Sequence, residues 1–145
     1  MKVREVMTDH VVRIHPEESV AVAARTLAQF NIGALPVCAQ NGSLLGVVTD
    51  RDLVTRCLAA GREPAATKVR QIMTRNALAV TPETEVAVAA HLMGRQQIRR
   101  LAVTEKGRLC GMVSLGDLAG TEESIMDAAD ALQDISGNVI EGKTW

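Results

Sequence analysis

The feature that most constrains this fold is an internal duplication. A shift of 66 residues places KVREVMT (2–8) over KVRQIMT (68–74), and 15 of the 37 consecutive pairs that start there are identical. After one position drops out, NGSLLGVVTDRDL (41–53) lies over KGRLCGMVSLGDL (106–118). Each copy has about 50 residues, too few for a well-buried core of its own. The two copies are therefore expected to fold together around one shared core.

Within each copy the pattern mixes α and β structure. In the first copy, residues 11–14 and 34–38 are predicted to be extended, and residues 44–48 follow after an Asn-Gly turn signal. Residues 19–30 have apolar side chains at helical spacing, and residues 50–60 are expected to form a closing helix. The predicted order is strand, helix, strand, strand, helix, repeated in the second copy. The predicted fold class is therefore α/β (α+β).

The repeat also sets the predicted domain limits. Residues 1–60 form the first domain, the polar Gly- and Pro-containing stretch 61–67 is a linker, and residues 68–119 form the second domain. Residues 120–145 lie outside the repeat and are expected to contain a helix that packs on the module or on a dimer partner; a regulatory tail is the alternative. One apolar stripe on this helix is predicted from Ile125, Ala128, Ala129, Leu132 and Ile135.

Composition argues against several classes of function. The net charge of −1 gives no reason to expect a nucleic-acid or membrane partner, and Phe30 and Trp145 are the only aromatic residues. No apolar run reaches the roughly 18 residues of a membrane span, and the first residues do not resemble a signal peptide. No P-loop, no dinucleotide-binding glycine motif and no nucleophile-and-base arrangement occurs in a fitting context. We therefore predict that the chain is not an enzyme.

The cysteine and histidine residues suggest no cofactor. Three cysteines, odd in number and far apart, are expected to be reduced and buried in a cytoplasmic protein. His10 and His15 would point to opposite faces of an extended segment, so no metal site is predicted there. The cysteines are Cys38, Cys57 and Cys110.

Two matching eight-residue stretches allow a structural and a functional interpretation. They are GVVTDRDL (46–53), the first octet, and GMVSLGDL (111–118), the second octet. Structurally, Thr49 with Asp52, and Ser114 with Asp117, have the spacing of a helix capping box. A duplication copies caps and binding sites alike, so recurrence does not decide between the two interpretations.

The functional interpretation uses the same atoms. An exposed Asp52 carboxylate could accept hydrogen bonds from both hydroxyl groups of a ribose, each contributing roughly 1.5–3 kcal/mol. Arg51 could neutralise a phosphate beside it. Gly46 and Gly111 have no Cβ, which would let a ligand approach the strand.

Three motifs together resemble a known family. Each copy contains G-h-h-[ST]-x-x-D, preceded by I-x-x-L-[PA]-V and by a V-R-x-[VI]-M-T start, where h is apolar. This combination resembles a pair of CBS domains, or Bateman module, over about residues 2–119, and is similar to small stand-alone bacterial proteins of that kind. The resemblance implies that two β-α-β-β-α domains pack through their sheets with pseudo-twofold symmetry.

The resemblance also implies a function. AMP, ADP, ATP or S-adenosylmethionine would occupy one or both of two clefts between the domains, and modules of this family commonly form homodimers. The first cleft would gather Arg51 and Arg99 for phosphate, whereas the second has Gly116 in place of the octet arginine. The implied first-cleft residues are Thr49, Arg51, Asp52, Ile98 and Arg99, and the second-cleft residues are Ser114, Asp117, Ile32, Gly33, Ala34 and Arg100.

We thus predict a regulatory module that senses an adenosyl ligand by changing its conformation or association, and that acts on a separate effector protein not identified by the sequence. The alternative is a ligand-free module for protein–protein interaction or dimerisation, in which the octets are only helix caps.

Overall fold

The computed structural model describes residues 1–120 and 125–140, and the side chains up to residue 136. The chain divides into two compact units. The first-copy unit comprises Val12–Ala77 and Gly107–Leu109. The second-copy unit comprises Met1–Val11, Leu78–Lys106 and the described residues from Cys110 onward. Each unit thus contains a segment from the other copy.

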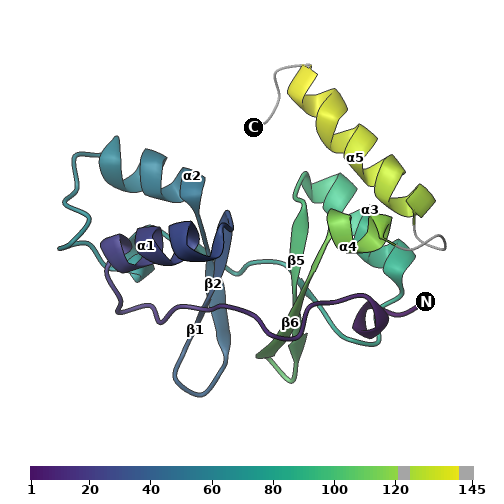
Figure 1. Ribbon diagram of the computed structural model, residues 1–145, viewed down its shortest axis with the longest axis horizontal. Coiled ribbons are helices and arrows are strands. Elements are labelled where there is room, and N and C mark those ends of the chain that lie inside the picture. The colour runs from purple at the N-terminus through teal and green to yellow at the C-terminus, as the bar shows by residue number, and fades with distance from the viewer. Residues whose placement is uncertain (121–124, 141–145) are drawn as a thin grey trace. The chain divides into compact units, whose positions relative to one another are not determined.

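The first-copy unit is a small antiparallel sheet with helices. Helix α1 (Val20–Phe30) begins where the Ser19 hydroxyl accepts a hydrogen bond from the amide of Val22, and it ends at Asn31 in the left-handed region. Strands β1 (Ala34–Cys38) and β2 (Leu44–Thr49) pair as an antiparallel hairpin (Figure 1). The strand order is β1-β2-β3. The remaining elements are β3 (Thr74–Arg75), α2 (Asp50–Asp52), the π-helical continuation Leu53–Leu58 and a 3-10 turn at Val69–Gln71.

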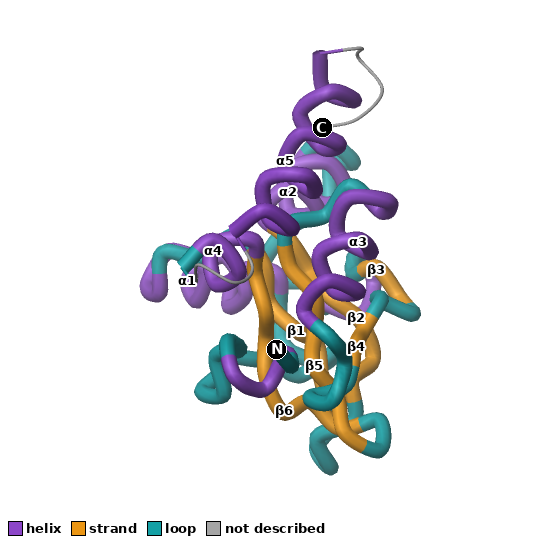
Figure 2. Tube along the Cα trace, turned by 90° about the vertical axis from the view of Figure 1, so that its right-hand side faces the viewer, coloured by secondary structure: helices purple, strands orange, loops and turns teal. Residues whose placement is uncertain are grey.

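The second-copy unit follows the same plan and adds a helix. Strand β4 pairs in parallel with β5, and the strand order is β4-β5-β6. In both units helices cover the strands, drawn purple and orange in Figure 2. Helix α5 packs on α3 and α4 (Figure 1). The elements are a 3-10 turn at Val3–Glu5, β4 (Ala79–Val80), α3 (Val86–Gln96), β5 (Arg100–Glu105), β6 (Arg108–Ser114), α4 (Leu115–Ala119) and α5 (Ile125–Ile140).

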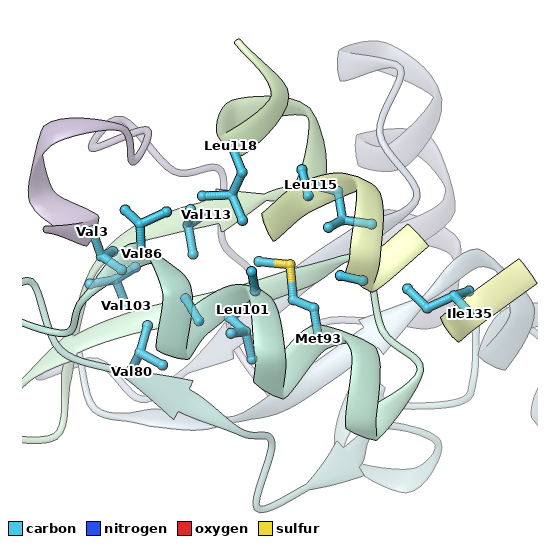
Figure 3. Close-up of a cluster of buried hydrophobic side chains, with 14 residues drawn as sticks. Val3, Val80, Val86, Met93, Leu101, Val103, Val113, Leu115, Leu118 and Ile135 are labelled. Carbon is cyan, nitrogen blue, oxygen red and sulfur yellow. The ribbon is translucent and has the colours of Figure 1, made fainter. Parts of the chain in front are cut away.

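The two start segments are exchanged between the copies. Val3 is fully buried in the core of the second-copy unit and lies beside Val86 and Val103 (Figure 3). Its amide donates to the carbonyl of Thr84 at 2.9 Å. In the same way, Val69 of the second copy is fully buried in the core of the first-copy unit. Each start segment therefore completes the core of the other copy.

Ion pairs repeat this exchange on the surface. The carboxylate of Glu17 contacts Lys68 Nζ at 2.6 Å and Arg70 Nε at 2.9 Å. In the second-copy unit, Glu83 pairs with Lys2 Nζ at 3.0 Å and with the Arg4 guanidinium. The hydrogen bond from Lys68 lowers the pKa of Glu17, with further lowering by the charges of Lys68 and Arg70. The hydrogen bond from Lys2 likewise lowers the pKa of Glu83.

The expectation that the two copies share a single core is wrong. Buried apolar residues form two clusters, one in each unit, because the exchanged start segments supply the surface that a single copy lacks. The second-copy cluster is drawn in Figure 3. Its largest fully buried members are Met93, Leu101, Leu118, Val3, Val103 and Val113.

Most of the predicted elements are confirmed. Helix 19–30, the two hairpin strands and the C-terminal helix lie where the sequence placed them. The predicted strand at 11–14 is wrong, because only Ile14 forms a bridge there, to Val37. The three cysteines are free thiols; Cys38 and Cys57 are buried as predicted, whereas Cys110 is only partly buried. Burial raises the pKa values of Cys38 and Cys110. Among the described residues, no helix is long and apolar enough to cross a membrane.

Candidate functional site

Both octets form the predicted capping boxes. The amide of Asp52 donates to Thr49 Oγ1 at 3.1 Å, and the amide of Thr49 donates to Asp52 Oδ2 at 2.9 Å. In the second octet the matching distances are 3.1 Å to Ser114 Oγ and 2.8 Å to Asp117 Oδ2. The structural interpretation is therefore confirmed. Each capping box uses Oδ2 of its aspartate, and Oδ1 takes no part in the cap.

The second carboxylate oxygen distinguishes the two octets. Oδ1 of Asp52 lies 3.6 Å from Arg56 Nε, one helical turn further on, and the residue is 8% exposed. Oδ1 of Asp117 has no hydrogen-bond or ion-pair partner within the described part of the chain, and the residue is only partly buried. Arg56 thus forms an ion pair with Asp52, whereas no described residue forms an ion pair with Asp117. Of the two octet carboxylates, only that of Asp117 has an oxygen with no partner among the described residues.

The octet glycines have a structural reason, and the interpretation that they admit a ligand is wrong. A Cβ on Gly46 would lie 2.3 Å from the carbonyl oxygen of Thr74. A Cβ on Gly111 would lie 2.8 Å from Met7 Sδ and 2.9 Å from the carbonyl oxygen of Thr8. In each unit the exchanged start segment therefore occupies the space beside the octet glycine.

A pocket opens beside the second octet, entirely within the second-copy unit. Its volume is about 560 Å³. Ser114 and Gly116 of the octet line it, and Arg99 and Arg100 lie at the start of β5. The amide of Leu115 donates to the carbonyl of Arg99 at 3.0 Å, which fixes Arg99 next to the octet. The remaining lining residues are Leu115, Ala119, Ile125, Ala128, Ala129 and Leu132.

The pocket combines positive charge with apolar walls. Arg99 and Arg100 are both exposed, and neither forms an ion pair with any described residue. None of the described lining residues is acidic. Arginine presents planar donors that match phosphate or carboxylate oxygens. The arrangement suits a molecule with an apolar body and an anionic group.

Comparison with known proteins decides the family. Two CBS domains are matched, at residues 3–59 and 69–124. The chain belongs to the CBS domain family. The chain is also 38% identical to the CBS domain-containing protein YhcV of Bacillus subtilis over 134 residues, which are 92% of this chain and 94% of that protein. The resemblance predicted from the three motifs is thereby confirmed.

Solved structures of CBS proteins are similar along most of the chain. Hypoxic Response Protein I with two coordinated zinc ions is 30% identical, with a TM-score of 0.77 over 83% of this chain and 98% of its own. CBSX2 in complex with AMP is 28% identical, with a TM-score of 0.76 over 86% and 98%. The CBS domain pair of protein MJ0100, in complex with methylthioadenosine and S-adenosyl-L-methionine, is 26% identical, with a TM-score of 0.74 over 83% and 98%. The mixed fold of this chain, with two small sheets, is that of these CBS pairs.

The structure groups the predicted site residues within each unit of the CBS pair. In the second-copy unit Arg99, Arg100 and Ser114 line one pocket, Asp117 caps the helix beside it, and Ile98 packs against the core. In the first-copy unit the carbonyl of Gly33 accepts from the amide of Asp50, the counterpart of the Arg99–Leu115 bond. Thr49 and Asp52 cap each other, Arg51 is exposed, and Ile32 and Ala34 are partly buried. Their predicted grouping across the two copies stays a prediction.

One part of the site was missed by the sequence interpretation. Helix α5 contributes Ile125, Ala128, Ala129 and Leu132 to the pocket, although it lies outside the repeat. The sequence predicts the apolar stripe, but nothing in it indicates that four of its five residues line a pocket beside the second octet. No group of three or more His, Cys, Asp or Glu side chains that could hold a metal occurs among the described residues.

Proposed function

We propose that this CBS pair is a regulatory, non-catalytic module that binds an adenosyl ligand of the AMP, ADP, ATP or S-adenosylmethionine class and responds with a change in conformation or association. The similar structures with AMP and with S-adenosyl-L-methionine support this class of ligand. Action on a separate effector protein and location in the cytoplasm remain predictions. A ligand can drive such a response only by binding one state more tightly than the other.

The pocket beside the second octet is the observation that carries this proposal. No described residue pairs with Asp117 Oδ1, so this atom can accept from a ribose hydroxyl group while Oδ2 caps the helix. Arg99 and Arg100 supply two guanidinium groups for a phosphate. The sequence favoured the first cleft for phosphate because Arg51 and Arg99 were both expected there, whereas Arg99 lines the pocket beside the second octet. The charges around the pocket favour the second octet instead, and they favour a nucleotide over the sulfonium cation of S-adenosylmethionine.

A second candidate, a ligand-free interaction module, is favoured by two observations. Both capping boxes are complete without any ligand. Val54 and Leu58, one helical turn apart after the first octet, are 56% and 60% exposed. Exposed apolar side chains of this kind are typical of surfaces that associate, which supports the predicted homodimer. Dimerisation and ligand binding are compatible with each other, so the experiment must address the ligand itself.

Thermal unfolding with and without AMP, ADP, ATP, adenosine and S-adenosylmethionine tests the proposal. A ligand at 100 times its Kd stabilises the fold by about 2.7 kcal/mol, which for a chain of this size raises the Tm by roughly 5–10 °C. We expect a shift with at least one nucleotide and a smaller one with adenosine. The variant Asp117→Asn should reduce the shift, because it removes the charge that the ribose hydroxyls bind.

Two arginine variants test the phosphate contact, one at the pocket and one as its matched control. Arg99→Gln should weaken nucleotides but not adenosine, since it removes a phosphate partner. Arg95→Gln removes an equally exposed arginine on α3 that does not line the pocket, and it should leave every shift unchanged. If no compound raises the Tm of the wild-type protein, the binding proposal fails and the interaction module is the better account. Equal shifts in wild type and Asp117→Asn would place the ligand elsewhere.

A further inference from the structure

Helix α5 presents two neighbouring apolar faces. Ala128, Ala131 and Ile135 are at most 5% exposed and belong to the core of the second-copy unit. Ile125 and Leu132 line the pocket and are 49% and 44% exposed. The single stripe expected from the sequence is therefore two stripes. One holds the helix in place, and the other faces a pocket that its side chains do not fill.

The docked position of α5 is set by a close contact with α3. A Cβ on Gly94 of α3 would lie 3.3 Å from the Cα of Ala131 and 2.9 Å from Asp134 Oδ2. Small residues at this crossing let the two helices approach closely, and Met93 beside Gly94 is fully buried. The apolar wall of the pocket is thus part of a packed interface and has a defined place next to the second octet.

The first copy has no counterpart to this wall. Its octet and closing helix end at Leu58 and are followed by turns through residue 67. The matched CBS domains end at residue 124, immediately before α5. Duplication therefore explains the two octets but not the pocket, which exists because a segment outside the repeat packs beside the second octet.

We propose that α5 is part of the ligand site, with its exposed apolar face packing against the adenine ring and Ala129 setting the size of the group that fits. This inference rests on the proposed function, whose anionic end at Arg99 and Arg100 fixes the orientation of the ligand. The apolar body of the nucleotide then points toward Ala129 and Leu132, and its binding covers their exposed surface. Because the same ligand touches the octet and α5, occupancy stabilises the docked helix.

Isothermal titration of AMP, ADP and ATP into wild-type protein and three variants tests this arrangement. Ala129→Met fills the pocket from an exposed position and should raise the Kd of the bound nucleotide about tenfold or more. Leu132→Ser removes apolar wall and should raise the Kd several-fold. The matched control is Ala87→Met, which adds the same side chain at an exposed alanine of α3 outside the pocket and should not change the Kd.

Hydrogen exchange gives an independent measurement. We expect bound nucleotide to slow amide exchange in residues 125–136 of the wild-type protein, and not in Ala129→Met at the same concentration. If a nucleotide binds the wild-type protein but Ala129→Met and Leu132→Ser retain its affinity and residues 125–136 exchange as before, the inference about α5 is overturned while the proposed function stands. If no adenosyl compound binds the wild-type protein, the proposed function itself is refuted, and the inference falls with it.

Discussion

The substitution Gly46→Ala tests whether the octet glycine serves the fold or a ligand. The added Cβ would lie 2.3 Å from the carbonyl oxygen of Thr74, whereas real Cβ contacts essentially never fall below 3.0 Å. The two strands would have to separate by at least the difference, about 0.7 Å. Both partners are backbone, held by the pairing of Gly46 with Arg75 and of Val47 with Thr74. No side chain can rotate away to relieve the contact.

The magnitude follows from three contributions. Forcing extra volume into a packed site costs about 1–3 kcal/mol, and weakening a hydrogen bond between β2 and β3 costs about 1 kcal/mol more. Alanine also lowers the conformational entropy of the unfolded chain, which offsets about 0.4–1 kcal/mol of this loss of stability. We expect a loss of roughly 2 kcal/mol in the free energy of unfolding, a decrease in Tm of about 5–10 °C for a chain of this length.

Urea unfolding followed by circular dichroism, without ligand, measures this loss. Gly116→Ala is the control, because its Cβ would meet only Ser114 Oγ at an ordinary 3.5 Å and alanine is the better helix former. The control should be as stable as the wild type or slightly more stable. If Gly46→Ala unfolds at the same urea concentration as the wild type, the close approach of β3 is refuted, and the glycine would have to serve another purpose.

Three further outcomes are expected. The pKa values of Glu17 and Glu83 are lowered, so their ion pairs stabilise the fold above pH 4.5, and this stabilisation is lost as the pH falls through the lowered pKa values. From pH 6 to 3, the Tm should therefore fall less in the Glu17→Gln/Glu83→Gln variant than in the wild type. Adding 0.5 M salt should reduce this difference in Tm. Because burial raises the pKa values of Cys38 and Cys110, a disulfide reagent at pH 7.5 should modify these thiols far more slowly in the native protein than in urea, and equal rates would contradict their burial. Gly94→Val should separate α5 from α3 at a cost of about 1–3 kcal/mol, detected as faster proteolysis of α5, whereas Ala87→Val on the exposed face of α3 should not.

Local signals in the sequence predicted most of the elements. Ser19 before an apolar helical pattern marks the start of α1, and the Asn41-Gly42 turn between two apolar runs marks the β1–β2 hairpin. The two capping boxes depend on residues three positions apart, so their spacing alone was sufficient. Such features lie within a few residues of one another, where a single sequence carries enough information.

Contacts between distant segments were not predictable in the same way. The exchange of start segments brings Val3 to Val86 and Val69 to Val20, pairs that no local periodicity connects. The glycines at positions 46 and 111 reflect these contacts, and without knowledge of the crossing backbone their small size was interpreted as access for a ligand. For the candidate site, the residues of the second octet and the two arginines were named in advance, whereas the wall from α5 depends on how a segment outside the repeat packs.

The exchange also limits where the two copies can differ. Each start segment must fit beside the octet glycine of the other copy, and each is bound by a glutamate at the matching position, Glu83 for the first segment and Glu17 for the second. A change in a start segment would affect the core of the unit that this segment completes. The residues around the octets bear no such constraint, and there the copies have diverged: Arg56 occupies the carboxylate of Asp52, while Arg99 and α5 leave a charged pocket beside Asp117. The Asp52 carboxylate is paired with Arg56, whereas the second octet lies beside a charged pocket, so we expect titration to find one nucleotide per chain.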